Sequence, residues 1–297
     1  MKKILYFILF IFPIWLNAET FEKIRVASLS TILTEVAQQV GGDRVIVTGI
    51  IKPGIDPHEF EPKPADIAII TEAQLILASG KHLESYLTKI HQNSNTRGVL
   101  VEVGDRFPSL KSKHEAETDH KAHSHSEDPH WWHSIANVKL AAAVVRDELI
   151  KIDPSGSADY RKNATAYTNK LDELEKWAKL KISELPRDQR KLVTSHDAFQ
   201  YFAREFGFTI YAIEGISKED EASNRKVTNI IDSIKKQHVK AIFGEFGTNP
   251  KVLQTITRDT GAKIGGELFA DGLGLDDAST YEGMIKHNIT TIVNGLK

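Results

Sequence analysis

Residues 157–185 read SADYRKNATAYTNKLDELEKWAKLKISEL, and this is the longest helical pattern in the chain. The run contains no Gly or Pro, and charged residues alternate around an apolar stripe. At about 1.5 Å per residue it would span about 40 Å, which is long enough to link two lobes. An ordinary helix within a single domain is the alternative. The stripe consists of Leu171, Leu174, Trp177, Ala178 and Ile182.

Strand and helix patterns alternate on both sides of this run, which indicates parallel sheets. We therefore expect an α/β fold of two lobes, each with a parallel sheet flanked by helices, joined by the long rigid helix. The lobes are expected at 19–156 and 186–297, with the linking helix at 157–185. The expected strands are 23–27, 44–51, 75–78, 99–103, 191–194, 209–213, 241–244 and 263–265. The expected helices, besides the linking one, are 31–40, 66–72, 82–90, 135–150, 198–206, 224–237, 251–260 and 281–296.

The first eighteen residues differ in kind from the rest. Lys2 and Lys3 precede an apolar run that ends at Leu16, and a small residue, Ala18, follows. This pattern predicts a secretory signal peptide at 1–18, cut after Ala18. The chain has no cysteine, so we expect a free periplasmic protein that is not a lipoprotein.

Composition narrows the function classes. The chain has 297 residues, with 38 basic and 40 acidic side chains and a formal net charge of −2. A nucleic-acid surface would need a clustered basic excess, so no nucleic-acid partner is expected. The hydrophobic content of 41% is typical of a soluble globular protein.

Histidines are concentrated in one tract, HEAETDHKAHSHSEDPHWWH, residues 114–133. Neutral imidazole is a common ligand of transition metals, and short His-rich tracts are typical of metal binding. A solvated loop with scattered histidines is the alternative. The loop is expected at about 111–127, and its histidines are His114, His120, His123 and His125.

Four metal-capable residues lie at expected strand-to-loop edges, where open α/β sheets bind ligands. Each taken alone could instead be a helix cap, a turn residue or a hydrogen-bonding core residue. They are His58 in PGIDPHEFEP, His130 in DPHWWHS, His196 in TSHDAF and Asp271 in GELFADGLG.

Six motifs in order resemble the metal-binding receptors of zinc and manganese ABC importers, the cluster A-I solute-binding proteins. The resemblance runs from about residue 22 to the end. It implies two α/β lobes joined by a rigid helix, with the metal buried between them. The motifs are PGIDPHEFEPKPAD, DPHWWHS, TSHDAFQYFAREFGF, EGISKEDEAS, IFGEFGTNPK and GGELFADGLG.

The resemblance implies His58, His130, His196 and Asp271 as the ligands. Three imidazoles and one carboxylate suit tetrahedral Zn²⁺, whereas a manganese receptor would more naturally use two carboxylates. We therefore expect a zinc receptor, with Mn²⁺ as the alternative cargo, that acts as a monomer and hands the ion to an ABC permease. The His-rich loop would be a weaker capture site.

One residue departs from the family pattern, because His133 stands where the family usually has an aliphatic residue. It could be a hydrogen-bonding partner of the site, an alternative ligand or an exposed residue.

Catalysis is the competing function class. A secreted zinc hydrolase could use Glu59 or Glu245 as its general base, but the chain has no HExxH helix. A metal-storage protein or adhesin is a third possibility. We expect a receptor and not an enzyme.

Overall fold

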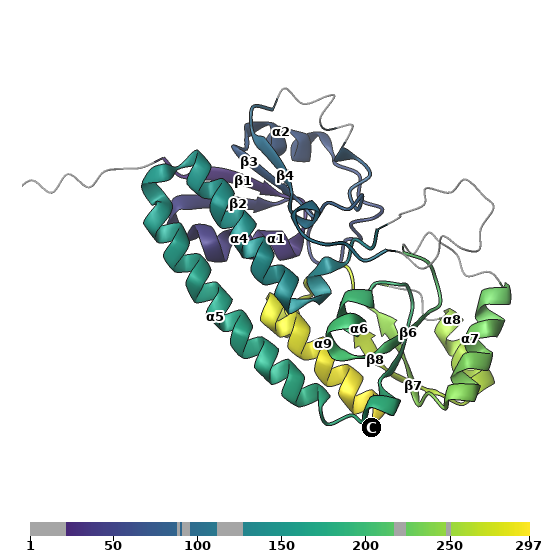
Figure 1. Cartoon of the computed structure of the whole chain (residues 1–297). Coiled ribbons are helices and arrows are strands. Elements are labelled where there is room, and N and C mark those ends of the chain that lie inside the picture. Colours follow the sequence, from purple (N-terminus) through teal and green to yellow (C-terminus); the bar gives the residue numbers. More distant parts are fainter. Residues whose placement is uncertain (1–21, 88–89, 91–95, 112–126, 217–223, 248–250) are drawn as a thin grey trace, which may run out of the picture.

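Two parallel four-stranded sheets organise the chain (Figure 1). The computed structural model describes residues 22–87, 90, 96–111, 127–216, 224–247 and 251–297. The first sheet has the order β2-β1-β3-β4 and the second the order β6-β5-β7-β8, so the expected α/β fold with two lobes is confirmed. The strands are β1 Ile24–Ser28, β2 Val45–Gly49, β3 Leu75–Ala78, β4 Val99–Glu102, β5 Lys191–Thr194, β6 Thr209–Ala212, β7 Ala241–Glu245 and β8 Lys263–Leu268.

The helices follow the sequence pattern closely. The last three helices start and end where the sequence predicts. Helix α6 begins at residue 200, two residues after its predicted start. The helices are α1 Thr31–Gly41, α2 Pro64–Glu72, α4 Ile135–Ile152, α5 Ser157–Ile182, α6 Gln200–Phe206, α7 Asn224–Gln237, α8 Lys251–Thr260 and α9 Tyr281–Leu296.

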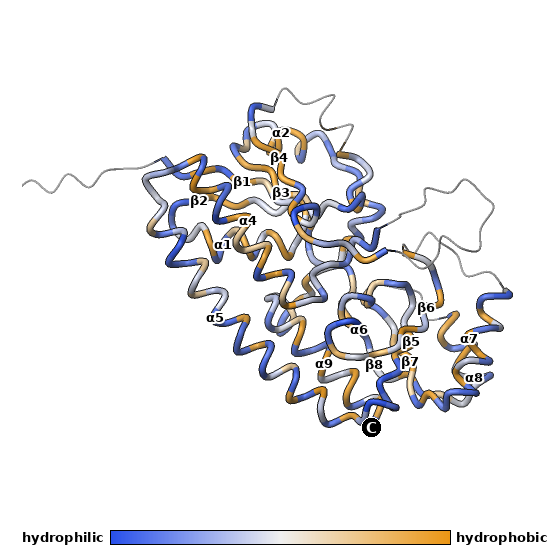
Figure 2. The backbone as a smooth tube through the Cα atoms, in the orientation of Figure 1, coloured by the Kyte–Doolittle hydropathy of each residue, from blue (hydrophilic) through white to orange (hydrophobic). Residues whose placement is uncertain are grey.

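Helix α1 illustrates how local sequence forms these elements. The Ser30 hydroxyl accepts a hydrogen bond from the Leu33 amide at 3.4 Å and so caps the helix start. The apolar residues recur at helical spacing and are all buried in the first lobe's core. The strands that this helix covers are largely apolar in Figure 2. The buried face consists of Ile32, Leu33, Val36, Ala37 and Val40.

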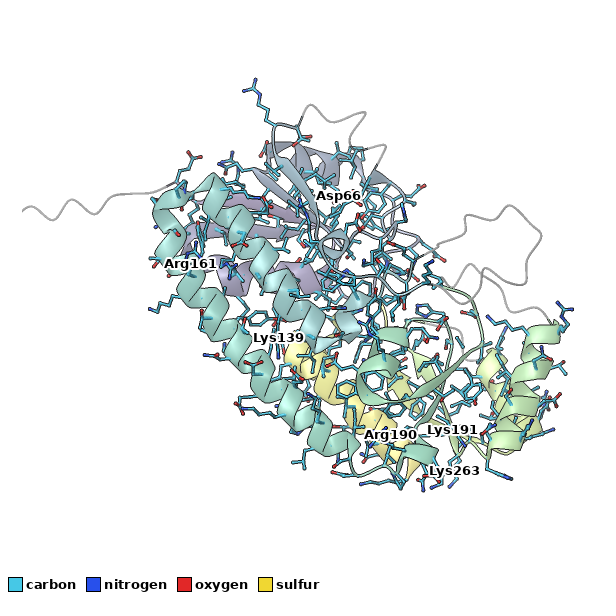
Figure 3. The ribbon with its side chains drawn as sticks, viewed as in Figure 1. Asp66, Lys139, Arg161, Arg190, Lys191 and Lys263 are labelled. Atoms are coloured by element: carbon cyan, nitrogen blue, oxygen red, sulfur yellow. The ribbon has the colours of Figure 1, made fainter. Side chains whose placement is uncertain are left out.

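Helix α5 runs along both lobes. It packs against α1 and α4 of the first lobe and against α9 of the second. Lys139 of α4 pairs with Asp172 and with Glu175 of α5, the latter at 2.6 Å (Figure 3). The expected stripe faces inward, with Trp177 only half-buried. The helix ends at Ile182 and a turn leads to proline 186, because the residue before a proline is pushed out of the helical region.

A partly buried acid fixes the corner between α4 and α5. The Asp153 carboxylate accepts hydrogen bonds from Arg44 Nε and from the Tyr160 hydroxyl, both at 2.9 Å. It also accepts from the Gly156 amide at 3.2 Å. Burial alone would raise the pKa of Asp153, but hydrogen bonds from the Ser155 hydroxyl, Arg44 and Tyr160 outweigh it and lower the pKa to about 2.

We expect Asp153→Asn to lower the free energy of unfolding at neutral pH by about 2 kcal/mol, the linkage value of this shift. The folded-state pKa is depressed, so this stability is fully present above the unfolded value of 3.8 and is lost as the pH falls toward about 2. Denaturant unfolding at pH 7, 4 and 2 checks it. A variant that loses stability equally at all three pH values would contradict the assignment.

Several expectations fall on residues that the structure does not describe. These are the signal peptide at 1–18, most of the His-rich loop and residues 88 and 89 of the expected helix at 82–90. The start of that helix was predicted wrongly, because residues 82–86 form turns and irregular structure and His82 has a φ of 61°. The lobe boundaries remain predictions. Within the ranges that are described, no helix has both the length and the apolar character required to cross a membrane.

Candidate metal centre

Three of the four candidate ligands lie in loops that follow strands, and the fourth lies in the turn before α4. His58 follows β2, His196 follows β5, Asp271 follows β8, and His130 precedes α4. Because the carboxyl ends of parallel strands meet at one edge of a sheet, residues far apart in sequence can converge there. The structure brings all four together: one ligand atom from each lies within 4.8 Å of the others.

The spacing of these atoms is that of a small coordination shell. The His130 Nε2 atom lies 3.1 Å from His58 Nε2 and 3.3 Å from His196 Nε2. The Asp271 Oδ1 atom lies 3.7, 3.6 and 3.2 Å from the Nε2 atoms of His58, His130 and His196. A tetrahedral ion with ligand distances of 2.0–2.2 Å has edges of about 3.3–3.6 Å. These five distances are close to those edges, and all four atoms lie within 4.8 Å of one another, so the group is compact enough to surround one such ion.

Two buried acids orient the imidazoles. The His130 Nδ1 atom lies 2.9 Å from Asp128 Oδ1, and His196 Nδ1 contacts Glu245 Oε2. Because a carboxylate only accepts, each Nδ1 carries a proton, which leaves each Nε2 as the nitrogen that can give a lone pair to a bound ion. The Glu245 carboxylate also accepts from the His196 backbone amide at 3.0 Å. The two acids therefore orient His130 and His196 with Nε2 toward the centre.

The electrostatics of the centre favour a cation. Burial lowers the pKa of His58. Burial acts in the same direction on His196, but Glu245 and Asp271 outweigh it and raise the pKa of His196 well above its usual value. Burial would raise the pKa of Asp271, yet His196 and the hydrogen-bonded imidazoles hold it well below its usual value. The carboxyl groups thus stabilise positive charge at this point.

His133 is buried, with 1% of its surface exposed, which rules out the exposed residue among the three alternatives. Its Nε2 atom lies 2.8 Å from the Ala270 carbonyl oxygen, and its ring centroid lies 4.4 Å from that of Phe199. Burial lowers the pKa of His133 to about 3, so the ring is neutral. It does not belong to the four-residue group of converging ligand atoms found among the described residues.

Sequence reasoning missed the two acids as partners of the imidazoles. Asp128 stands two residues before His130, and its Oδ1 atom also accepts from the His130 backbone amide at 2.9 Å. This Asp-Pro-His turn is a local signal that could have been found. Glu245 ends β7, which neighbours β5, so only the strand order places it beside His196.

A cleft of about 510 Å³ leads to Asp271. Residues of both lobes line it, including Lys52 from the first and Phe246 from the second. Glu59 also lines the cleft, whereas Glu245 is buried and occupied by His196. Glu245 is therefore not placed to act as a general base for a substrate in this cleft.

Known proteins resemble the chain along most of its length. The family model described as zinc-uptake complex component A, periplasmic (ZnuA) matches residues 26–295. The manganese-binding lipoprotein MntA of Halalkalibacterium halodurans is 32% identical, over 94% of this chain and 91% of that protein. The iron-binding protein YfeA of Yersinia pestis is 30% identical, over 94% and 88%. The structure of the periplasmic zinc-binding protein TroA of Treponema pallidum superposes with a TM-score of 0.83 at 28% identity, covering 93% of this chain and 99% of that one.

The comparisons correct one expectation. We expected a protein that is not a lipoprotein, but several of the relatives are named lipoproteins, and this points to a lipoprotein. The exclusion rested on the missing cysteine and on the pattern at 1–18, which lies outside the described residues.

The four histidines of the His-rich loop, His114, His120, His123 and His125, also lie outside the described residues, which resume at 127. The structure describes the two ends of the tract. Lys111 and Glu127 form an isolated antiparallel bridge, and the Asp128 amide donates to the Leu110 carbonyl at 2.9 Å. The two residues that flank the His-rich loop therefore lie side by side in the first lobe, shortly before His130.

Proposed function

We propose a function from one premise: this chain belongs to the ZnuA family of metal-binding receptors of ABC transporters. Members of the family are substrate-binding proteins that work with a permease, and they are not enzymes. The finer proposal is that this chain carries one Zn²⁺ ion, held by His58, His130, His196 and Asp271, to its permease.

The observation that carries the proposal is the convergence of three Nε2 atoms and one carboxylate oxygen at tetrahedral spacing. Four protein atoms at that spacing fill the coordination shell of Zn²⁺, so no position stays open for an activated water. This donor set suits binding and transfer of the ion, and it does not suit hydrolysis.

Manganese is the second candidate, because relatives in the family are named for manganese, zinc and iron. Manganese prefers oxygen ligands and higher coordination, whereas imidazole suits zinc. The centre offers one carboxylate among its four ligand residues, so the donor chemistry supports zinc.

We expect Zn²⁺ to bind on the order of a hundredfold more tightly than Mn²⁺, following the general affinity order of nitrogen-rich sites. The measurement is a competitive titration of metal-free protein with both ions, together with metal analysis of protein purified without added metal. Equal or stronger binding of Mn²⁺ would reject the zinc assignment and leave the four-residue site intact.

The His-rich tract keeps its place in the proposal as a second, weaker zinc site. The described residues that flank the loop meet at the bridge between Lys111 and Glu127, and Glu127 stands three residues before His130. The role of the tract stays a prediction.

A further inference from the structure

His133 contacts three of the four segments that carry the proposed ligands. Its backbone amide donates to the His130 carbonyl at 3.3 Å. Its Nε2 atom lies 2.8 Å from the carbonyl of Ala270, the residue before Asp271. Its ring lies 4.4 Å from the ring of Phe199, three residues after His196, at an interplanar angle of 30°.

The hydrogen bond defines the tautomer of His133. A carbonyl oxygen only accepts, so Nε2 carries the proton and Nδ1 carries the lone pair. The Nδ1 atom is buried and has no hydrogen-bond partner among the described residues. Among the described residues, the only hydrogen bond of the ring is therefore the one that Nε2 donates to a backbone carbonyl. A histidine in this arrangement supports the loop that it contacts and does not act as a metal ligand.

The Ala270 carbonyl receives a second donor from the same turn. Trp132 Nε1 donates to it at 2.9 Å, and a carbonyl oxygen has two lone pairs to accept both. On the other side of Asp271, the Leu273 amide donates to the Thr31 hydroxyl at 2.8 Å. The loop that carries Asp271 belongs to the second lobe in sequence, yet first-lobe side chains hold it on both sides.

We propose that His133 is a positioning residue that acts through Asp271. By holding the Ala270 carbonyl against the turn after His130, it keeps the Asp271 carboxylate at its distance from the His130 imidazole and slows release of the bound ion. The inference rests on the proposed function, because it assumes that these residues bind the metal. A residue that supports a ligand in this way typically contributes tenfold to a hundredfold to metal affinity.

The first test is His133→Phe, which keeps a ring against Phe199 and removes the donor. It also removes the unpartnered Nδ1, so we expect little change in the melting temperature of metal-free protein. We expect release of Zn²⁺ to a chelator in excess, followed by stopped flow, to be roughly tenfold faster, because the Trp132 donor remains. His133→Gln, whose amide can donate to the same carbonyl, should keep release slow.

A double-mutant cycle separates positioning from a general effect on packing. In the Asp271→Asn background, His133→Phe should produce no further change in the Zn²⁺ dissociation constant, because coupled residues are non-additive. The matched control is His287→Phe: its Nε2 also lies 2.9 Å from a carbonyl, that of Glu267, and its ring lies 4.9 Å from Phe269. It therefore contacts the same segment four and two residues before Asp271, but it does not hold the Ala270 carbonyl. It should release Zn²⁺ at the wild-type rate.

The possible outcomes distinguish a failure of the proposed role of His133 from a failure of the proposed function. Additive effects in the cycle, or an unchanged release rate in His133→Phe, would overturn the role of His133 while wild type still binds Zn²⁺ tightly. A wild-type chain without a tight Zn²⁺ site, or an Asp271→Asn variant that binds like wild type, would instead overturn the proposed function and the inference with it.

Discussion

His196→Ala is expected to abolish tight binding of Zn²⁺. Four-ligand zinc sites contribute about 10–16 kcal/mol, so one ligand accounts for roughly 3–4 kcal/mol, or about a 10²–10³-fold rise in the dissociation constant. His196 is fully buried and lies 3.2 Å from Asp271 Oδ1 and 3.3 Å from His130 Nε2. Competition with a fluorescent zinc chelator measures the change.

The same substitution leaves Glu245 buried without its imidazole partner, which destabilises the fold separately. The double variant His196→Ala/Glu245→Gln removes that charge and retains an amide oxygen to accept from the residue 196 backbone amide. We expect it to regain the melting temperature lost by His196→Ala without regaining zinc binding. The exposed His287→Ala is the matched control for loss of an imidazole. Wild-type zinc affinity in His196→Ala would remove His196 from the site.

The second large effect is on folding. Trp131→Ala is expected to lower the free energy of unfolding by about 3–5 kcal/mol, the range for deleting a large aromatic side chain from a core. Trp131 is fully buried, its ring lies 5.1 Å from that of Phe107, and its Nε1 donates to the Ser79 carbonyl at 3.0 Å. Gly104 packs so closely that a Cβ there would lie 2.7 Å from Nε1. The surrounding backbone is tightly packed and cannot collapse into the cavity.

Denaturant unfolding of metal-free protein measures this effect. Trp131→Phe is the matched control, because it retains an aromatic ring beside Phe107 and loses only the indole donor and part of the volume. It should be destabilised by less than half as much as the alanine variant. A loss below about 1 kcal/mol in Trp131→Ala would show that the turn after His130 is not part of the cooperative core.

Local patterns predicted the secondary structure well, because each element depends on residues close in sequence. Helices α7, α8 and α9 have the bounds that their apolar spacing predicts, and Ser30 marks the start of α1. The candidate ligands could be picked out because histidine and aspartate at strand ends are unusual, and the family resemblance then grouped them. The boundary of α6 was less well predicted, since helix ends depend on capping geometry that the sequence leaves open.

Sequence by itself determined the α/β class, the strands and the positions of the metal-capable residues. Only the tertiary structure decided that His196 pairs with Glu245, because those residues meet through the neighbouring strands β5 and β7. It also decided the environment of His133, whose local sequence is equally compatible with a surface turn. The physical reason is that burial and hydrogen-bond partners are set by contacts between distant segments, here Ala270 and Phe199, which no local pattern encodes.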